Sequence, residues 1–159
     1  MTDLTHILNW RRIDPRITSS GQPTEAQLAE IQALGVTHII NLGPHHNKGA
    51  LNDEAGTVAA LGMSYIYIPV EFEDPTDQNF ADFQAELEAN PEAKIHIHCI
   101  YNARVSAFIY RHAKTQPELS EISAFERMES IWRPGDDWAD IIGDPNAKGM
   151  PNRYAGQDY

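Results

Sequence analysis

The chain has 159 residues, with a formal net charge of −11 and an isoelectric point near 4.9. So large an acidic excess repels nucleic acid and anionic membrane surfaces, and we expect neither as a partner. No segment approaches the roughly 20 apolar residues of a membrane span, and the first residues lack the basic start and apolar middle of a secretion signal, so a cytoplasmic protein is expected.

The first half of the chain alternates predicted helices with predicted strands. Apolar residues at helical spacing predict the helices, with Thr24 and Asn52 as expected N-caps and Gly35 at the end of the first helix. Short runs of β-branched and aromatic residues predict the strands. In chain order these elements cover residues 24–35 (helix), 36–43 (strand), 52–62 (helix) and 63–70 (strand).

The second half continues this alternation until two helices follow each other. Phe80, Phe83 and Leu87 share one face of the next predicted helix. The elements cover residues 78–91 (helix), 94–99 (strand), 103–114 (helix) and 120–132 (helix). Such alternation predicts an α/β fold with a largely parallel sheet in one domain, residues 1–142. Residues 143–159, rich in Gly, Pro, Asn and Asp, are expected to be an irregular tail.

The only cysteine of the chain, Cys99, stands where a predicted strand ends and a helix begins. Backbone N–H groups at such a junction lack intrahelical partners, and the helix dipole adds positive potential, so an anion is favoured there. The same potential, with Arg104 close by, favours the ionised and nucleophilic form of a thiol. The planar guanidinium of Arg104 matches two oxygens of a phosphate or sulfate. Nucleophile and anion-binding group thus share one short segment.

These parts are typical of a phosphatase that attacks phosphorus with a cysteine thiolate and passes through a phosphocysteine intermediate. The chemistry needs neither a metal nor another cofactor, and none is expected. It does need a proton donor for the leaving oxygen, usually a carboxylic acid on a neighbouring loop.

Five segments carry a resemblance to a known family. The stretches SSGQPT, GVTHIINL, YIYIPV, HCIYNARVSAF and IWRPGDDW resemble the small bacterial protein-tyrosine-phosphatase-like proteins related to the dual-specificity phosphatases, over about residues 16–142. The resemblance implies a three-layer α/β sandwich, with a central, mainly parallel sheet of four or five strands flanked by helices. It also implies a phosphorylated protein or small molecule as substrate, with phosphate or sulfate bound in the loop after the last strand.

The spacing of this loop departs from the parent motif. Cysteine phosphatases of that superfamily usually have five residues between Cys and Arg and a glycine in the loop, whereas four residues separate Cys99 from Arg104 and none is glycine. Aligned without a gap, Val105 takes the arginine position. The small bacterial branch shares a loop that is one residue shorter. In such a loop Arg104 is the anion-binding arginine, and Asn102 adopts the left-handed backbone conformation that Asn tolerates better than most residues. The expected phosphate-binding residues are Ile100, Tyr101, Asn102, Ala103, Arg104 and Val105.

The resemblance places the general acid in the loop EFEDPTD, after the preceding strand. Phe72 holds the position at which the family usually has the acid. We prefer Asp74, because Pro75 stiffens the loop around it, with Glu71, nearest the strand end, as second choice. The remaining candidates are Glu73 and Asp77. Taken singly, each of these carboxylates is more typical of a solvated surface loop than of a catalytic site.

Several histidines have two interpretations. His98 is interpreted as structural, hydrogen-bonded behind the loop. His96 shares a strand face with His98, so an H-x-H metal pair is an alternative, although zinc needs further ligands. The loop with His45, His46 and Asn47 follows the strand predicted at 36–43. We interpret this loop as polar surface, and a place at the pocket mouth is the alternative.

Three other functions stay open on the sequence alone. The short, glycine-free loop is compatible with a pseudophosphatase that binds an oxyanion without turnover. The C-x4-R spacing also occurs in rhodanese-type loops, which transfer sulfur through a cysteine persulfide. A metal hydrolase built on His96 and His98 is the third. For the leading hypothesis, the phosphatase, Tyr101 and Phe72 are candidates to shape a pocket for an aromatic substrate.

Overall fold

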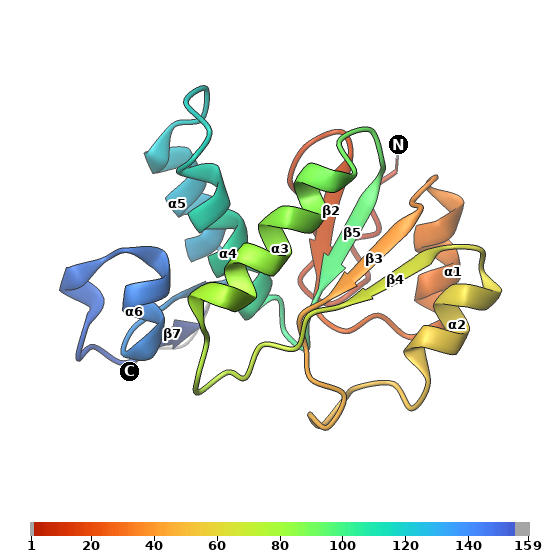
Figure 1. Ribbon diagram of the computed structural model, residues 1–159, viewed down its shortest axis with the longest axis horizontal. Coiled ribbons are helices and arrows are strands. Elements are labelled where there is room, and N and C mark those ends of the chain that lie inside the picture. Colours follow the sequence, from red (N-terminus) through yellow and green to blue (C-terminus); the bar gives the residue numbers. More distant parts are fainter. Residues whose placement is uncertain (1, 155–159) are drawn as a thin grey trace.

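A five-stranded sheet forms the middle layer of the computed structural model, which describes residues 2–154 (Figure 1). The strand order is β1-β2-β5-β3-β4, in which β2, β5, β3 and β4 are parallel and β1 is an antiparallel edge strand. The strands are β1 (Arg11–Arg12), β2 (Ile17–Ser20), β3 (His38–Asn41), β4 (Ser64–Tyr67) and β5 (Ile95–His98). The predicted α/β class with a mainly parallel sheet of four or five strands is therefore confirmed.

Helices cover both faces of this sheet and complete three layers (Figure 1). Ile39 and Ile40, neighbours in β3, point to opposite faces, as strand geometry requires. Ile39 belongs to a hydrophobic cluster with α1 and α2. Ile40 belongs to a larger cluster with α3, α4, α5 and α6. The bounds are α1 (Glu25–Ala33), α2 (Glu54–Ala60), α3 (Asp77–Ala89), α4 (Ala103–Ala113), α5 (Glu121–Glu129) and α6 (Asp137–Ile142).

The sequence predicts N-cap residues for α1 and α2. Thr24 caps α1 in a capping box with Gln27, as its sequence predicts. The expected cap of α2 was wrong by one residue, since the side chain of Asp53, not Asn52, accepts the hydrogen bond from the N–H of Gly56. Both residue types are good N-caps, so the sequence alone did not distinguish them.

The sequence pattern did not reveal β2, although it lies in the interior of the sheet. Three of its four residues are Thr18, Ser19 and Ser20, all buried and polar. Thr18 and Ser20 are satisfied by His96 on the neighbouring β5, with Oγ1 to Nδ1 and Oγ to Nε2 distances of 2.8 Å each. Burial of this polar strand thus depends on a partner about 76 residues away along the chain.

The described part of the C-terminal tail is ordered against the domain. Residues 145–147 form a 3-10 helix, η1 (Pro145–Ala147), and β7 (Arg153–Tyr154) pairs antiparallel with β6 (Trp132–Arg133). The ring of Tyr154 stacks on that of Trp132, with centroids 5.6 Å apart. The predicted irregular tail thus contains two short regular elements between residues 143 and 154, while residues 155–159 lie outside the described part of the chain.

The four parallel strands end at one edge of the sheet, at the bottom of Figure 1. The register aligns Ser20 of β2, His98 of β5 and Asn41 of β3. Tyr67, in the edge strand β4, pairs with Asn41. Loops at the carboxyl ends of parallel strands commonly bind ligands. Within residues 2–154, no helix has the length and apolar character to cross a membrane.

Candidate functional site

The connection from β5 to α4 is a tight loop whose last residue is in the left-handed region. Asn102 is the N-cap of α4, with φ 75° and ψ 5°. Its Nδ2 donates to the backbone oxygen of Asn9 (2.8 Å) and to Oγ of Ser19 (3.2 Å), so the strained residue is tied to two other segments. This is the backbone geometry expected for a shortened loop in which Asn102 replaces glycine.

Carbonyl groups of the loop are held by residues outside it. The Cys99 oxygen accepts from Nδ1 of His98 (3.1 Å), and the Ile100 oxygen accepts from the backbone N–H of Gln22 (3.0 Å). The Tyr101 oxygen accepts from Nδ2 of Asn9 (2.9 Å). Within residues 2–154, by contrast, the backbone N–H groups of the three loop residues 100–102 have no acceptor. The loop is therefore arranged to donate hydrogen bonds on one side.

Arg104 lies at the start of α4 and is almost completely buried, with 7% of its surface exposed. Its Nη2 donates to Oδ1 of Asn47 at 2.8 Å, and its Cζ lies 5.5 Å from the ring centroid of Phe72. Its Nε is buried and has no hydrogen-bond partner among the described residues. A buried guanidinium with an unpaired N–H is poised to bind an oxyanion. The side chain of Val105 instead packs in the main hydrophobic cluster.

Cys99 begins the loop and is fully buried as a free thiol. A Cβ placed on Gly43 would lie 3.4 Å from the Cys99 Cα and from Cδ1 of Ile100. The chain after β3 therefore passes directly over the loop, and a side chain at position 43 would crowd it. Thiol, loop and Arg104 occupy the N-terminal end of an eleven-residue helix.

The loop of residues 45–49, which follows β3, contacts the site through Asn47. The ring of His45 stacks on that of Tyr67, with centroids 3.8 Å apart, and its Nε2 lies 2.8 Å from the hydroxyl of Tyr65. Burial raises the pKa of that Tyr65 hydroxyl above its ordinary value. Asn47, two residues later, is the residue that contacts Arg104. His45 and His46 are exposed, as the interpretation of this loop as polar surface predicts, whereas Asn47 reaches the site. Its position after a strand end was the one signal for a place at the site.

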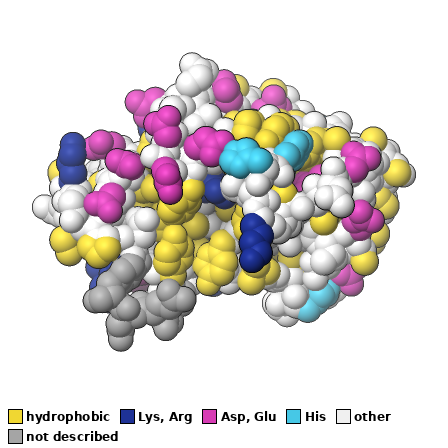
Figure 2. Space-filling view, turned by 90° about the horizontal axis from the view of Figure 1, so that it is seen from below, with side chains coloured by type: hydrophobic (Ala, Val, Ile, Leu, Met, Phe, Trp, Pro, Cys, Tyr) yellow, Lys and Arg dark blue, Asp and Glu magenta, His cyan; other side chains and the backbone are white. Residues whose placement is uncertain are grey.

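The carboxylates of the acidic loop after β4 have different partners and different exposure. Asp77 starts α3 and pairs with Arg111 (2.8 Å), while Glu71 pairs with His46 (2.8 Å). Asp74 and Glu73 are exposed, and the Asp74 N–H donates to the Glu71 backbone oxygen (3.1 Å). No carboxylate of this loop hydrogen-bonds the Cys99–Arg104 segment within residues 2–154. Seen from below, histidine and acidic side chains gather on this face beside hydrophobic surface (Figure 2).

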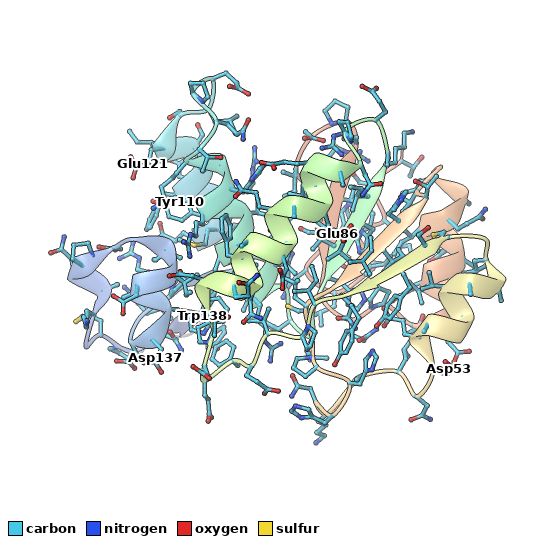
Figure 3. The ribbon with its side chains drawn as sticks, viewed as in Figure 1. Asp53, Glu86, Tyr110, Glu121, Asp137 and Trp138 are labelled. Carbon is cyan, nitrogen blue, oxygen red and sulfur yellow. The ribbon has the colours of Figure 1, made fainter. Side chains whose placement is uncertain are left out.

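Phe72, from the same acidic loop, is anchored in the hydrophobic core. Its backbone oxygen accepts from Nε1 of Trp138 at 2.7 Å, and its ring packs against Trp132 and Trp138. Trp138 comes from α6 and lies near the start of α3 (Figure 3). The ring of Phe72, held in place by these contacts, thus packs against the guanidinium of Arg104.

Both histidines of β5 are buried and fully bonded. His96 contacts Thr18 and Ser20, and burial, with the charge of His98, holds its pKa well below its ordinary value. His98 donates to Cys99 and lies 2.6 Å from Oε2 of Glu54, so its expected structural place behind the loop is confirmed. Among residues 2–154, no group of three or more His, Cys, Asp or Glu side chains could hold a metal ion.

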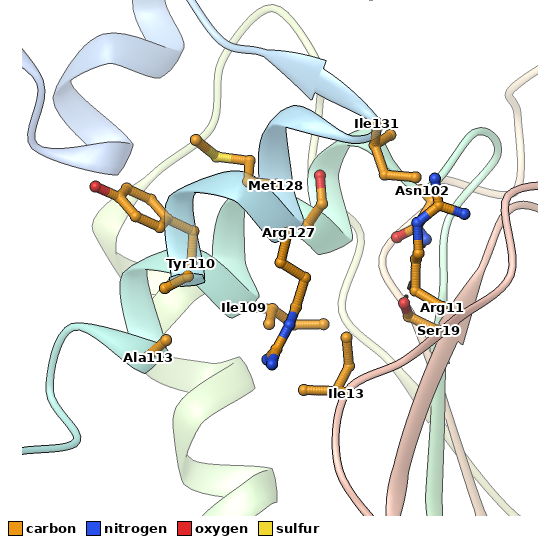
Figure 4. A pocket seen from close by; sticks show the side chains of 12 residues that line it. Arg11, Ile13, Ser19, Asn102, Ile109, Tyr110, Ala113, Arg127, Met128 and Ile131 are labelled. Atoms are coloured by element: carbon orange, nitrogen blue, oxygen red, sulfur yellow. Dashed lines mark hydrogen bonds between the residues drawn. The ribbon is translucent and has the colours of Figure 1, made fainter. Parts of the chain in front are cut away.

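A small cavity of about 10 Å³ lies behind the loop, between α4, α5 and the β1–β2 hairpin (Figure 4). Asn102 lines it together with Ser19 and Ser106. The Oδ1 atom of Asn102 is buried and finds no donor among the described residues. The conformation of Asn102 is therefore linked to packing on the side of the loop away from the thiol.

The profile of the family described as beta-lactamase hydrolase-like protein, phosphatase-like domain, matches residues 9–114. The chain belongs to this family. The beta-lactamase hydrolase-like protein of Agrobacterium fabrum (strain C58) is 32% identical over 91 residues, which are 55% of this chain and 21% of that protein. The chain thus spans about a fifth of the length of this relative.

Solved structures share the fold. A DUF442 protein from Shewanella putrefaciens CN-32 has a TM-score of 0.79 at 26% identity, with 91% of this chain and 97% of that chain covered. Tk-PTP in the active form has a TM-score of 0.68 at 18% identity, with 90% and 98% covered. P. aeruginosa TpbA in complex with pTyr has a TM-score of 0.64 at 17% identity, with 90% and 83% covered. The family match makes this chain a phosphatase-like domain, and the predicted resemblance to protein-tyrosine-phosphatase-like proteins is confirmed.

Proposed function

We propose that this chain is a metal-independent, cysteine-dependent phosphatase in which Cys99 is the nucleophile. The observation that carries the proposal is the buried Nε of Arg104, which has no partner among the described residues and stands at the same helix N-terminus as the thiol. Arg104 and the backbone N–H groups of the loop from Ile100 to Val105 bind the equatorial oxygens of the phosphoryl group. These donors stabilise the charge that develops in the transition state.

The proposed reaction has two steps. The thiolate of Cys99 attacks phosphorus, the S–P bond forms, and the P–O bond to the leaving group breaks as that oxygen takes a proton from a carboxylic acid. Water then attacks the phosphocysteine, gives a proton to the same carboxylate, and releases inorganic phosphate and the thiolate. Asp74 is proposed as this acid, because it forms no ion pair within residues 2–154, whereas Glu71 and Asp77 do, and because Pro75 follows it directly, unlike Glu73.

The substrate is proposed to be an aromatic or similarly small phosphomonoester. The half-exposed ring of Tyr101 packs edge-on against Tyr154, with centroids 5.8 Å apart, and Phe72 lies under the Arg104 guanidinium. Aromatic side chains on two sides of an anion site favour a ring next to the phosphate. The pTyr complex of TpbA has the same fold.

The test is phenolate release from p-nitrophenyl phosphate by the metal-free protein, from mildly acidic to neutral pH, beside its Cys99→Ser variant. We expect release that Cys99→Ser abolishes, with phosphate binding retained, because a hydroxyl is a poor nucleophile at these pH values. Arg104→Lys should weaken both binding and rate, since an ammonium cannot make the two-pronged contact. Arg111→Lys, which changes a partly buried arginine of the same helix that pairs with Asp77, is the matched control and should change neither.

Other outcomes separate the alternatives. Phosphate binding without any Cys99-dependent release from aryl phosphates would contradict the enzyme and favour a pseudophosphatase. Cyanolysis of thiosulfate that requires Cys99, without phosphate release, would favour sulfur transfer through the C-x4-R loop. Loss of activity on chelation, with recovery on adding zinc, would favour metal-dependent hydrolysis.

A further inference from the structure

A buried carboxylate from another element reaches the residue behind the thiol. Glu54 is the first residue of α2, directly after the cap Asp53, which Figure 3 shows at the edge where the strands end. Its side chain is 1% exposed and that of His98 is fully buried. The distance from Oε2 of Glu54 to Nε2 of His98 is 2.6 Å, the length of a charge-assisted hydrogen bond.

The hydrogen-bond partners restrict where the protons of this pair lie. The backbone oxygen of Cys99 can only accept, so Nδ1 of His98 carries a proton. Oε1 of Glu54 accepts from Nε2 of Gln22 at 2.8 Å, which occupies the other carboxylate oxygen. One further proton must lie in the short bond between Nε2 and Oε2. The pair is therefore either imidazolium with carboxylate or imidazole with carboxylic acid.

The surroundings favour the charged form. Burial raises the pKa of the Glu54 carboxyl, but the charge of His98 and the hydrogen bonds from His98 and Gln22 outweigh burial, so the pKa lies below its ordinary value. His96, whose ring centroid is 6.5 Å from that of His98, is neutral and bonded to hydroxyls. With Gln22 donating to one carboxylate oxygen and the short bond from His98 reaching the other, the geometry favours the proton on His98.

We propose that Glu54 is a positioning residue that keeps His98 as an imidazolium immediately behind Cys99 and thereby favours the thiolate. His98 lies between Glu54 and the loop, so the positive end of the pair is nearer the sulfur than the negative end, and the two charges do not cancel there. Without a carboxylate partner, a fully buried imidazole is neutral, because burial disfavours its charged form. This role rests on the proposed function, in which Cys99 is the nucleophile.

The test is a pH titration of the thiolate by its ultraviolet absorbance. The chain has one cysteine, so the signal reports Cys99 alone once the Cys99→Ser spectrum is subtracted, and no reagent has to enter the site. The variant is Glu54→Gln, which preserves size and removes the charge. Glu30→Gln is the matched control, because Glu30 also lies 2.8 Å from a histidine, His6, but both side chains are about half exposed.

We expect the midpoint of thiolate formation in Glu54→Gln to move upward by about one pH unit, with no change in Glu30→Gln. A midpoint in folded Glu54→Gln that equals that of the unsubstituted protein would overturn the role. Nitrogen-15 spectra of the histidine rings give a second reading on the unsubstituted protein. Two protonated nitrogens on His98, assigned with His98→Asn, are expected near neutral pH, and a neutral ring would contradict the proposal even if Glu54→Gln does not fold. Neither measurement needs turnover, so an inactive protein would count against the proposed function and not against this role.

Discussion

Asn47 and Arg104 meet through a hydrogen bond of 2.8 Å between Oδ1 and Nη2, although 57 residues separate them in the chain. Asn47 follows β3 and Arg104 follows β5, and these two strands are neighbours in the sheet. The contact engages one end of the guanidinium and leaves Nε without a described partner. In the proposed phosphatase, this contact orients the arginine toward the bound anion.

The first prediction concerns Asn47→Asp. A carboxylate at this position pairs with Arg104 and competes with a bound oxyanion, so we expect phosphate affinity, measured by calorimetry, to fall about tenfold or more, since a hydrogen bond to a charged group contributes about 1.5–3 kcal/mol. Asn47→Ala frees the arginine without adding charge and should have a smaller effect. Unchanged affinity in Asn47→Asp would place Arg104 outside the anion site.

A second prediction concerns the backbone of Asn102, whose φ is 75°. Asn102→Ala loses the hydrogen bonds to Asn9 and Ser19 and places in the left-handed region a residue that tolerates it less well than Asn, so unfolding free energy should fall by about 2–4 kcal/mol. Asn102→Gly loses the same bonds without strain, so its unfolding free energy should fall by only about 1–2 kcal/mol. Urea denaturation measures both. Equal losses in the two variants would show that strain at this position contributes nothing.

The third prediction concerns the pH dependence of stability at His96. Burial lowers the pKa of His96 far below 6.5, so the unfolded chain takes up the proton first as pH falls. Its contribution to stability is therefore complete above about pH 6.5 and declines below it, by at most about 1.4 kcal/mol per pH unit.

Urea midpoints across this pH range measure the effect, and His96→Gln should flatten the decline. Burial also lowers the pKa of His112, so some decline remains in that variant. His6→Gln, at an exposed histidine, should leave the slope unchanged. A slope that survives intact in His96→Gln would refute the assignment to this residue.

The fourth prediction concerns the proton donor. Asp74→Asn should slow hydrolysis of phenyl phosphate, a poor leaving group, by about 100-fold and affect p-nitrophenyl phosphate much less, because only the poor leaving group needs the proton. The pH–rate profile should lose its dependence on a protonated acid. The same pattern in Glu71→Gln, with a normal Asp74→Asn, would transfer the role to Glu71. Glu73→Gln is the control on the same loop.

Local signals in the sequence predicted much of this protein. Periodic apolar residues and caps such as Thr24 predicted α1 to α5 but not α6, because these preferences depend on neighbours within one turn and are weak in a short helix. The junction of strand and helix at Cys99 was predicted in the same way, together with the left-handed Asn102 of a shortened loop. The motifs of those segments were sufficient to indicate the family.

Only the tertiary structure decided which distant residues meet at that junction. The strand order brings β3 and α2 beside β5, so Asn47 reaches Arg104 and Glu54 reaches His98 across 57 and 44 residues. The polar strand β2 is buried for the same reason, because His96 satisfies its hydroxyls. A single sequence carries no local trace of such pairings. They arise because parallel strands align their carboxyl ends and so bring together residues that are distant in the chain. A charge or hydroxyl buried there is compatible with a stable fold only where a hydrogen-bond partner lies within reach.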